Sequence, residues 1–108
     1  MEATPIAVEE YCADDGKNHF RAWLEDLKDS KARAIIDARI ARARMGNLGT
    51  NRSLGGHLYE LKIDFGPGYR IYFGREGDRM VILLCGGTKR RQGADIKLAE
   101  KLWNEYRS

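Results

Sequence analysis

Two basic residues occupy polar, solvent-facing positions in neighbouring segments whose hydropathy alternates. Lys62 and Arg70 each lie between two apolar residues, and a turn over residues 64–68 joins the segments. Hairpin pairing is expected to place both side chains on one face of a sheet, close to or opposite each other. Like charges in that arrangement destabilise a sheet. The pair therefore favours a shared anionic ligand, although neutralisation by Glu60 or Asp64 is a purely structural alternative.

A second basic group, Lys89, Arg90 and Arg91, directly follows the apolar run over residues 80–85. If that run is the third strand, the three basic residues lie where the chain leaves the sheet. There they can add positive charge to the same edge as Lys62 and Arg70. An exposed basic turn without a ligand explains them equally well. We predict that Lys89 and Arg90 act in catalysis together with the first pair, and that Arg91 contacts the ligand.

Signatures of many known enzyme classes are missing, because the sequence has no Walker A loop, no HExxH motif and no GxSxG motif. His19 and His57 are the only histidines, so neither a metal site nor a cofactor is expected. His57 precedes a predicted strand. It is either a surface or packing residue or a general base, a role in which histidine is common. We include His57 among the residues that are candidates to contact the ligand.

Cleavage of RNA by its own 2′-hydroxyl group is the reaction that suits such a basic cluster. Because the substrate carries the nucleophile, the protein has only to position the phosphate, stabilise its developing charge and assist two proton transfers. Arginine grips phosphate with a fixed fork, whereas lysine acts as a point charge or as a base. Tyr72 shares the alternation of Arg70 and is a candidate for stacking on a base, although strand aromatics more often pack in a core.

Hydrophobic periodicity predicts two helices in the first half of the chain. The first, over residues 17–27, has an apolar face made of Phe20, Trp23, Leu24 and Leu27. Asp29 and Ser30 separate and cap the second, whose apolar face is made of Ala32, Ile35, Ile36, Ile40 and Ala43. Together they predict a helical hairpin. Its outer basic residues are either solvated or contact RNA: Arg33, Arg39, Arg42 and Arg44.

A sheet and a last helix complete the predicted fold. Residues 46–56 are rich in Gly and Asn and predict a loop. Three antiparallel strands are predicted, over residues 59–63, 69–73 and 80–85. Apolar residues between Leu98 and Tyr106 predict an amphipathic helix. The expected class is α+β, with two N-terminal helices, an antiparallel sheet of three to four strands and a C-terminal helix in one domain over residues 1–108.

Size, charge and cysteine content limit the class of protein. With 108 residues, 43% hydrophobic and 32% charged, the chain suits one core and not disorder. The formal net charge of +3 suits an acidic partner or RNA without establishing either. No apolar run approaches about 18 residues and the N-terminus resembles no secretion signal, so a cytoplasmic protein without membrane contact is expected. Cys12 and Cys85 are expected to be structural thiols.

Several stretches together resemble a known family. The more specific are Gly66-Pro67-Gly68-Tyr69-Arg70-Ile71-Tyr72-Phe73 and Leu83-Leu84-Cys85-Gly86-Gly87-Thr88-Lys89. Weaker matches are Arg44-Met45-Gly46-Asn47-Leu48-Gly49, the segment from Gly55 to Ile63, Gln92, Asp95-Ile96 and Ala99, and the N-terminal Phe20, Trp23 and Leu24. Over nearly its whole length the chain resembles the phage-derived, Gp49-like branch of the HigB-type addiction-module killer proteins, within the RelE/ParE toxin superfamily.

This resemblance implies the RelE/ParE toxin fold and a toxin encoded beside an antitoxin with a helix-turn-helix domain. For RelE-like members it also implies ribosome-dependent cleavage of mRNA. Carried onto this chain, the strand arginine of the family motif is Arg70, the basic residue of the preceding strand is Lys62, and the basic pair after the last strand is Lys89 and Arg90. Some relatives place a tyrosine near the scissile phosphate. This chain has Ala94-Asp95-Ile96 there, which leaves the general base unassigned.

Three functions remain open on the sequence. The retained Lys62, Arg70 and Lys89 favour a metal-independent mRNA endoribonuclease that works on the ribosome. A ParE-like toxin that binds and inhibits DNA gyrase shares the superfamily fold, and so does an inactive module that only binds the antitoxin. No small-molecule substrate is expected.

Overall fold

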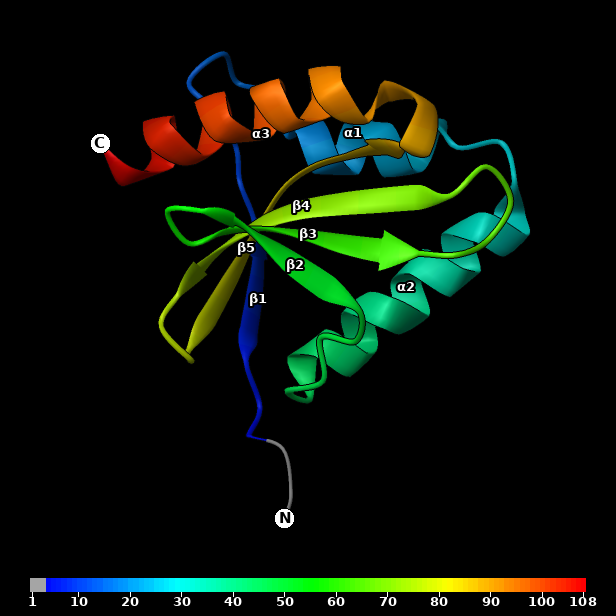
Figure 1. The fold of residues 1–108 in the computed structure, drawn as a ribbon, viewed down its shortest axis with the longest axis horizontal. Helices are drawn as coiled ribbons and strands as arrows, with labels where there is room; N and C mark the ends of the chain where they lie inside the picture. The colour runs from blue at the N-terminus through cyan, green and yellow to red at the C-terminus, as the bar shows by residue number, and fades with distance from the viewer. Residues whose placement is uncertain (1–3) are drawn as a thin grey trace.

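The computed structural model describes residues 4–108 and has helices on both faces of a five-stranded sheet (Figure 1). In chain order the elements are β1 Ala7–Glu10, α1 His19–Asp26, α2 Ser30–Arg44, β2 Asn51–Gly55, β3 Leu58–Ile63, β4 Tyr69–Glu76, β5 Met80–Thr88, the 3₁₀ turn η1 Lys89–Arg91 and α3 Gln92–Arg107. Residues 1–3 lie outside the described residues. They belong to the N-terminal stretch for which the sequence analysis expects no secretion signal. Each helix within residues 4–108 is too short or too polar to cross a lipid bilayer.

The sheet is mixed, with the strand order β1-β5-β4-β3-β2. β1 runs parallel to β5, whereas β5, β4, β3 and β2 pair antiparallel with their neighbours. The α+β class and the C-terminal helix are thus confirmed. The prediction of a purely antiparallel sheet of three to four strands is wrong, because β1 adds a parallel edge strand and β2 adds a strand at the other edge.

The other edge strand, β2, lies in the stretch that was predicted to be a loop. Its residues are mostly exposed and show no apolar alternation, so only the hydrogen-bonded register with β3 makes it a strand. The turn between the two strands has three successive residues with positive φ: Gly55 at 94°, Gly56 at 60° and His57 at 66°. Glycine adopts this left-handed conformation freely, which explains the glycine pair.

The predicted apolar stripes of the helices form two separate cores. On one face of the sheet, Phe20 and Leu24 of α1 and Ile36 of α2 pack with sheet residues such as Ile71 and Phe73. On the other face, α3 packs through Ala99, Leu102 and Trp103. α1 contacts β5 and α2 contacts β1, so the first two helices pack on different strands rather than mainly on each other as a hairpin.

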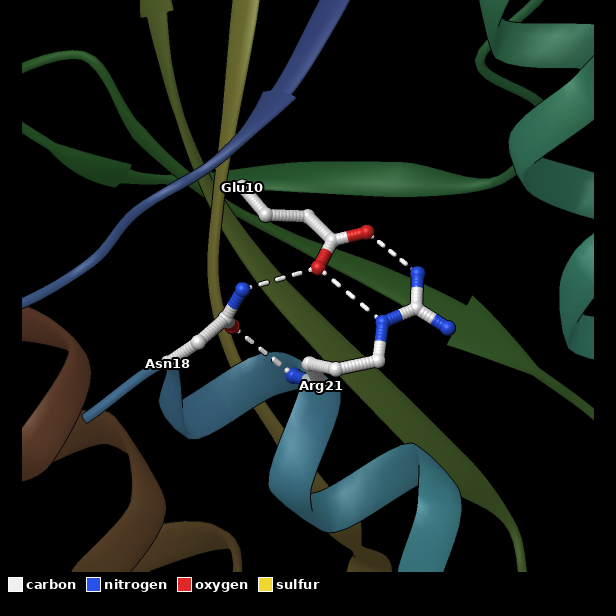
Figure 2. Close-up of polar contacts among 3 residues, drawn as sticks. All are labelled: Glu10, Asn18 and Arg21. Atoms are coloured by element: carbon white, nitrogen blue, oxygen red, sulfur yellow. Dashed lines mark hydrogen bonds and ion pairs between the residues drawn. The ribbon is translucent and has the colours of Figure 1, made fainter.

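Polar contacts fix the beginnings of the first two helices. Asp29 caps α2 by accepting hydrogen bonds from the backbone N–H groups of Lys31 and Ala32 at 3.0 and 3.1 Å. Figure 2 shows the contacts that tie α1 to β1. Asn18 accepts from the backbone N–H of Arg21 at 2.9 Å and donates to Glu10 Oε1 at 2.9 Å, while Arg21 donates to both carboxylate oxygens of Glu10.

The two cysteines differ in their surroundings. Cys85 is buried, and burial raises the pKa of its thiol to about 12, as expected for a structural thiol. Cys12 is exposed, so the usual burial of free cysteines, on which its prediction as a structural thiol was based, does not hold for it. It lies just beyond β1, where the chain leaves the sheet.

Candidate functional site

The register of β3 and β4 places Lys62 directly opposite Arg70, as predicted. The next pair on the same face is Glu60 and Tyr72, and α3 covers this face. Lys62, Arg70 and Glu60 line a cavity of about 380 Å³ together with Thr50, Asn51, Arg52 and Gln92. We call it the Arg70 cavity.

Arg70 is buried, with only 6% of its surface exposed. The solvent-facing position that its alternation indicated is therefore wrong, because α3 and the turn after β5 cover this part of the sheet. Its Nη1 donates to the carbonyl oxygen of Tyr69 at 3.3 Å. Among residues 4–108, no carboxylate forms an ion pair with Arg70. A buried charge without a partner is costly, so the site is suited to an anion supplied from outside.

The two lysines lie at the same end of the sheet as Arg70. Lys62 is exposed, and its Nζ lies 3.6 Å from Asp64 Oδ1. The predicted neutralisation by a carboxylate therefore applies to Lys62 but not to Arg70. The backbone N–H of Lys89 donates to the carbonyl oxygen of Gly68 at 2.8 Å. A Cβ built on Gly68 would lie 3.5 Å from both Arg70 Nη1 and Lys89 Cβ, so the Arg70 guanidinium and the Cβ of Lys89 both border the turn at Gly68.

The other predicted site residues do not line the Arg70 cavity. Arg90 and Arg91 are exposed on η1, and Arg91 lines a different cavity, of about 550 Å³, between α1 and α3. Tyr72 has no exposed surface, so the prediction that its ring stacks on a base is wrong: the ring packs in the core under α3. The carbonyl oxygen of His57 accepts a hydrogen bond from the backbone N–H of Arg75. Arg75 is five residues along β4 from Arg70, a strand length of about 17 Å, so His57 is far from the Arg70 cavity.

The arginines of α2 also divide into two kinds. Arg42 and Arg44 are exposed, so for them both alternatives remain: a solvated helix face or a contact with RNA. Arg39 donates to the carbonyl oxygens of Lys62 at 3.0 Å and Leu48 at 3.3 Å, and Arg33 donates to the carbonyl oxygen of Leu27. These two side chains hold loops in place.

Glu60, which the sequence suggested only as a neutralising partner for Lys62 and Arg70, pairs instead with Arg52. Its side chain is buried and accepts hydrogen bonds from Arg52 Nε at 2.7 Å, Gln92 Nε2 at 2.7 Å and the Tyr72 hydroxyl at 2.9 Å. Burial by itself would raise the pKa of Glu60, but these hydrogen bonds together hold it below its usual value. Burial and the bond to Glu60 raise the pKa of Tyr72. Glu60 thus stays ionised and fixes Arg52 at the cavity.

Asp95, from the first turn of α3, is a half-buried carboxyl group near Arg70. Gly87 is the residue paired with Arg70 on β5, and a Cβ on Gly87 would overlap Asp95 Oδ2. The carboxyl group therefore occupies the place of a missing side chain in the row of Lys62 and Arg70. Within residues 4–108, Oδ2 is buried without a hydrogen-bond partner, and burial raises the pKa of Asp95 although Arg91 partly opposes this.

The chain is similar to a known protein in its amino-acid sequence. No family model matches the chain, and no solved structure matches it. A protein of Haemophilus influenzae named "Uncharacterized protein" is 46% identical over 86 residues, which are 80% of this chain and 87% of that protein. The similarity extends over most of both chains, and the chain belongs to the same family as this Haemophilus influenzae protein.

Proposed function

We propose that the chain is the toxin of a type II toxin–antitoxin module with a RelE/ParE-like fold, and that it cleaves mRNA on the ribosome without a metal ion. The observation that carries this proposal is Arg70, a buried guanidinium at a cavity that has no carboxylate partner among residues 4–108. An anion that enters the cavity would compensate this charge. A phosphodiester fits the planar fork of a guanidinium well.

The reaction is substrate-assisted. The 2′-oxygen of the RNA attacks the adjacent phosphorus and loses its proton, while the bond to the 5′-oxygen breaks and that oxygen gains a proton. The products are a 2′,3′-cyclic phosphate and a 5′-hydroxyl. Arg70 stabilises the charge that develops on the phosphate, with Lys62 and Lys89 adding positive charge beside it. Glu60 acts as a positioning residue, because three donors already occupy its carboxylate.

The cellular setting follows from this proposal. The toxin works in the cytoplasm, where mRNA and ribosomes are found. Its partner is an antitoxin with a helix-turn-helix domain, which inhibits it either by covering the Arg70 cavity or by docking on the helices. An acidic segment suits the first mode, because the cavity carries Arg52, Lys62 and Arg70 against the single carboxylate of Glu60.

The decisive experiment is the substitution Arg70→Ala, with Arg70→Lys and the exposed Arg42→Ala as comparisons. Loss of one preorganised charge contact of this kind lowers a rate by about 10²–10³, so Arg70→Ala should neither arrest growth nor cleave mRNA. Arg70→Lys should keep part of the activity, and Arg42→Ala all of it. Growth after induction, primer extension on cellular mRNA and a melting curve of each variant provide the three measurements.

Two results would contradict the proposal. A folded Arg70→Ala protein that arrests growth as fast as the parent would remove the site, and if gyrase were then inhibited, the toxin would be of the gyrase-binding kind. Products with 5′-phosphate ends and a strict metal requirement would exclude the substrate-assisted mechanism.

A further inference from the structure

The cavity of about 550 Å³ between α1 and α3 lies beside the last part of β5. Trp23 of α1 and Leu98 of α3 line it from opposite faces of the sheet, because the two side chains pack on different cores. A cavity that touches side chains from both faces must lie at an edge of the sheet. Residues 85–88 of β5 also line it. We call it the β5 groove.

β1 covers only the first part of this edge of β5. Its last paired residue is Glu10, opposite Leu83, and a backbone bond of 3.0 Å from the N–H of Tyr11 to the carbonyl oxygen of Leu83 extends the pairing by one residue. The chain then turns away, and Ala13 packs in the core under α3. Residues 85–88 therefore lie in a slot between two helices, with no strand of residues 4–108 beside them.

Gly86 and Thr88 direct their backbone polar groups into the groove. Alternate residues of an antiparallel strand bond to the same neighbour. The N–H of Lys89 donates to the carbonyl oxygen of Gly68, just before β4, so Gly87 also faces β4, and it is buried. Gly86 and Thr88 face the other way and are half-exposed. The N–H and C=O of Gly86 and the N–H of Thr88 have no backbone partner among residues 4–108.

The spacing of these groups matches an extended polypeptide. The N–H groups of Gly86 and Thr88 are two residues apart, about 7 Å, which is also the repeat of a neighbouring strand. Trp23 and Leu98 are half-exposed on opposite walls, where successive side chains of such a strand would reach them. Each would bury further apolar surface against a ligand with apolar side chains. The groove thus offers backbone groups and side-chain contacts to a strand.

Other kinds of ligand suit the groove less well. Its basic Lys17 and Arg91 are matched by the acidic Asp26 and Asp95, so a neutral peptide backbone fits the lining better than a phosphate. A second copy of this chain is also excluded. α1 and α3 flank the edge and keep another folded sheet from approaching to about 4.8 Å, the spacing of paired strands.

We infer that the β5 groove binds an extended segment of a partner protein, which adds to the sheet as a strand beside β5. Alternate backbone groups of this segment pair with Gly86 and Thr88, one of its apolar side chains packs on Trp23, and the next packs on Leu98. The inference does not depend on what the Arg70 cavity binds.

Amide hydrogen exchange of the full chain, followed by NMR, tests whether the edge is free. The amides of Gly86 and Thr88 should exchange about tenfold or more faster than the amide of Gly87, because only Gly87 is bonded to β4. If Gly86 and Thr88 are as protected as Gly87 in the free protein, the edge is already occupied and the inference is overturned.

A phage-displayed library of random peptides of about six residues, the usual length of a strand, tests the ligand. Peptides selected on the parent protein should slow exchange at Gly86 and Thr88 and leave Gly87 unchanged. In such a peptide, N-methylation should weaken binding about tenfold at every second residue only, because alternate N–H groups face β5. A library that yields no peptide, or N-methylation that acts equally at every position, would contradict strand addition.

Ala22→Trp provides the matching change in the protein. Ala22 is exposed and lines the groove, so a large ring there should fill it and weaken peptide binding about tenfold or more. Ala38→Trp is the control, since Ala38 is an exposed alanine within α2 that does not line the groove. Melting curves show whether both variants fold. Equal binding by a folded Ala22→Trp protein would overturn the inference, as would protection of Gly86 that grows with protein concentration without peptide, which would assign the groove to a second copy.

Discussion

Charged side chains inside this protein differ in whether they have partners, and this difference decides what each does. The carboxylate of Glu60 is surrounded by three donors, so it is stable when ionised. Arg70 has one backbone acceptor and no carboxylate partner among residues 4–108. Asp95 has a buried oxygen without any partner within the same residues. Glu60 therefore has a structural role, whereas Arg70 lacks a compensating carboxylate among residues 4–108 and Asp95 is compensated only in part, by Arg91.

Asp95→Asn should stabilise the protein at neutral pH by about 1–2 kcal/mol, because it removes the charge of a half-buried carboxyl group whose Oδ2 has no hydrogen-bond partner among residues 4–108. The raised pKa of Asp95 means that the folded state binds its proton more tightly than the unfolded state, so the parent should lose stability as the pH rises above 3.8. The variant should lack this loss. Urea denaturation over a series of pH values measures both effects.

The matched control for that experiment is Glu100→Gln, an exposed carboxylate on the same helix, which should change stability little. An Asp95→Asn protein that is less stable than the parent at every pH would show that the carboxylate has a favourable partner.

At the scale of elements, the helices approach the sheet at glycines. A Cβ on Gly86 would overlap the Trp23 ring of α1, and a Cβ on Gly87 would overlap the carboxyl group of Asp95 on α3. The adjacent pair serves opposite faces, because successive residues of a strand point to opposite sides. A third such contact lies at Gly74, where a Cβ would overlap the Trp103 ring. These glycines set how closely α1 and α3 lie on the central strands.

Gly87→Ala should therefore displace the first turn of α3 and lower the free energy of unfolding by about 1–3 kcal/mol. The double variant Gly87→Ala/Asp95→Ala should recover much of that loss, because the overlapping carboxyl group is gone. Thermal denaturation of the parent protein, the single variants Gly87→Ala and Asp95→Ala, and the double variant measures the coupling between the two residues.

Gly93→Ala is the control for overpacking, since a Cβ there has nothing within 4 Å and its backbone is helical. It should be neutral or slightly stabilising, by up to about 1 kcal/mol. A Gly87→Ala protein as stable as Gly93→Ala would mean that α3 is not held at this point.

For the whole molecule, two buried or half-buried glutamates connect elements that are distant in the sequence. Glu10 joins β1 to α1 through Arg21 and Asn18 (Figure 2), and hydrogen bonding to Arg21 is the main cause of its lowered pKa. Glu60 joins β3 to β2, β4 and α3. Both groups need their negative charge for these contacts, so the layers of the molecule are held together partly by ionised carboxylates.

The protein should consequently lose stability in acid. Since the pKa values of Glu10 and Glu60 are lowered on folding, their contribution is present above pH 4.5 and is lost as the pH falls below it. Glu10→Gln/Glu60→Gln should be less stable at neutral pH and should show a flatter dependence in acid. The comparison is best made on an Asp95→Asn background, because Asp95 changes stability in the opposite direction. If the double variant loses stability in acid as steeply as the parent, the pH dependence of stability must come from groups other than Glu10 and Glu60.

What the sequence determined by itself is the local structure. Periodicity over a few residues located α1, α2, α3 and the strands β3 to β5, and the capping role of Asp29 could be identified from its type and place. The opposition of Lys62 and Arg70 was also predictable, because a short turn fixes the register of a hairpin. These features depend on contacts between residues that are close in the chain.

Tertiary structure alone decided which of these residues are buried and what they touch. β1 is a strand only through β5, and β2 only through β3, because neither has enough apolar alternation to show it alone. Arg70 and Tyr72 share the alternation of exposed residues, yet both are buried. Elements from later in the chain cover that face of the sheet, and a strand's own residues carry no record of what packs upon it. The same reason hid the partners of Glu60, which come from three other elements.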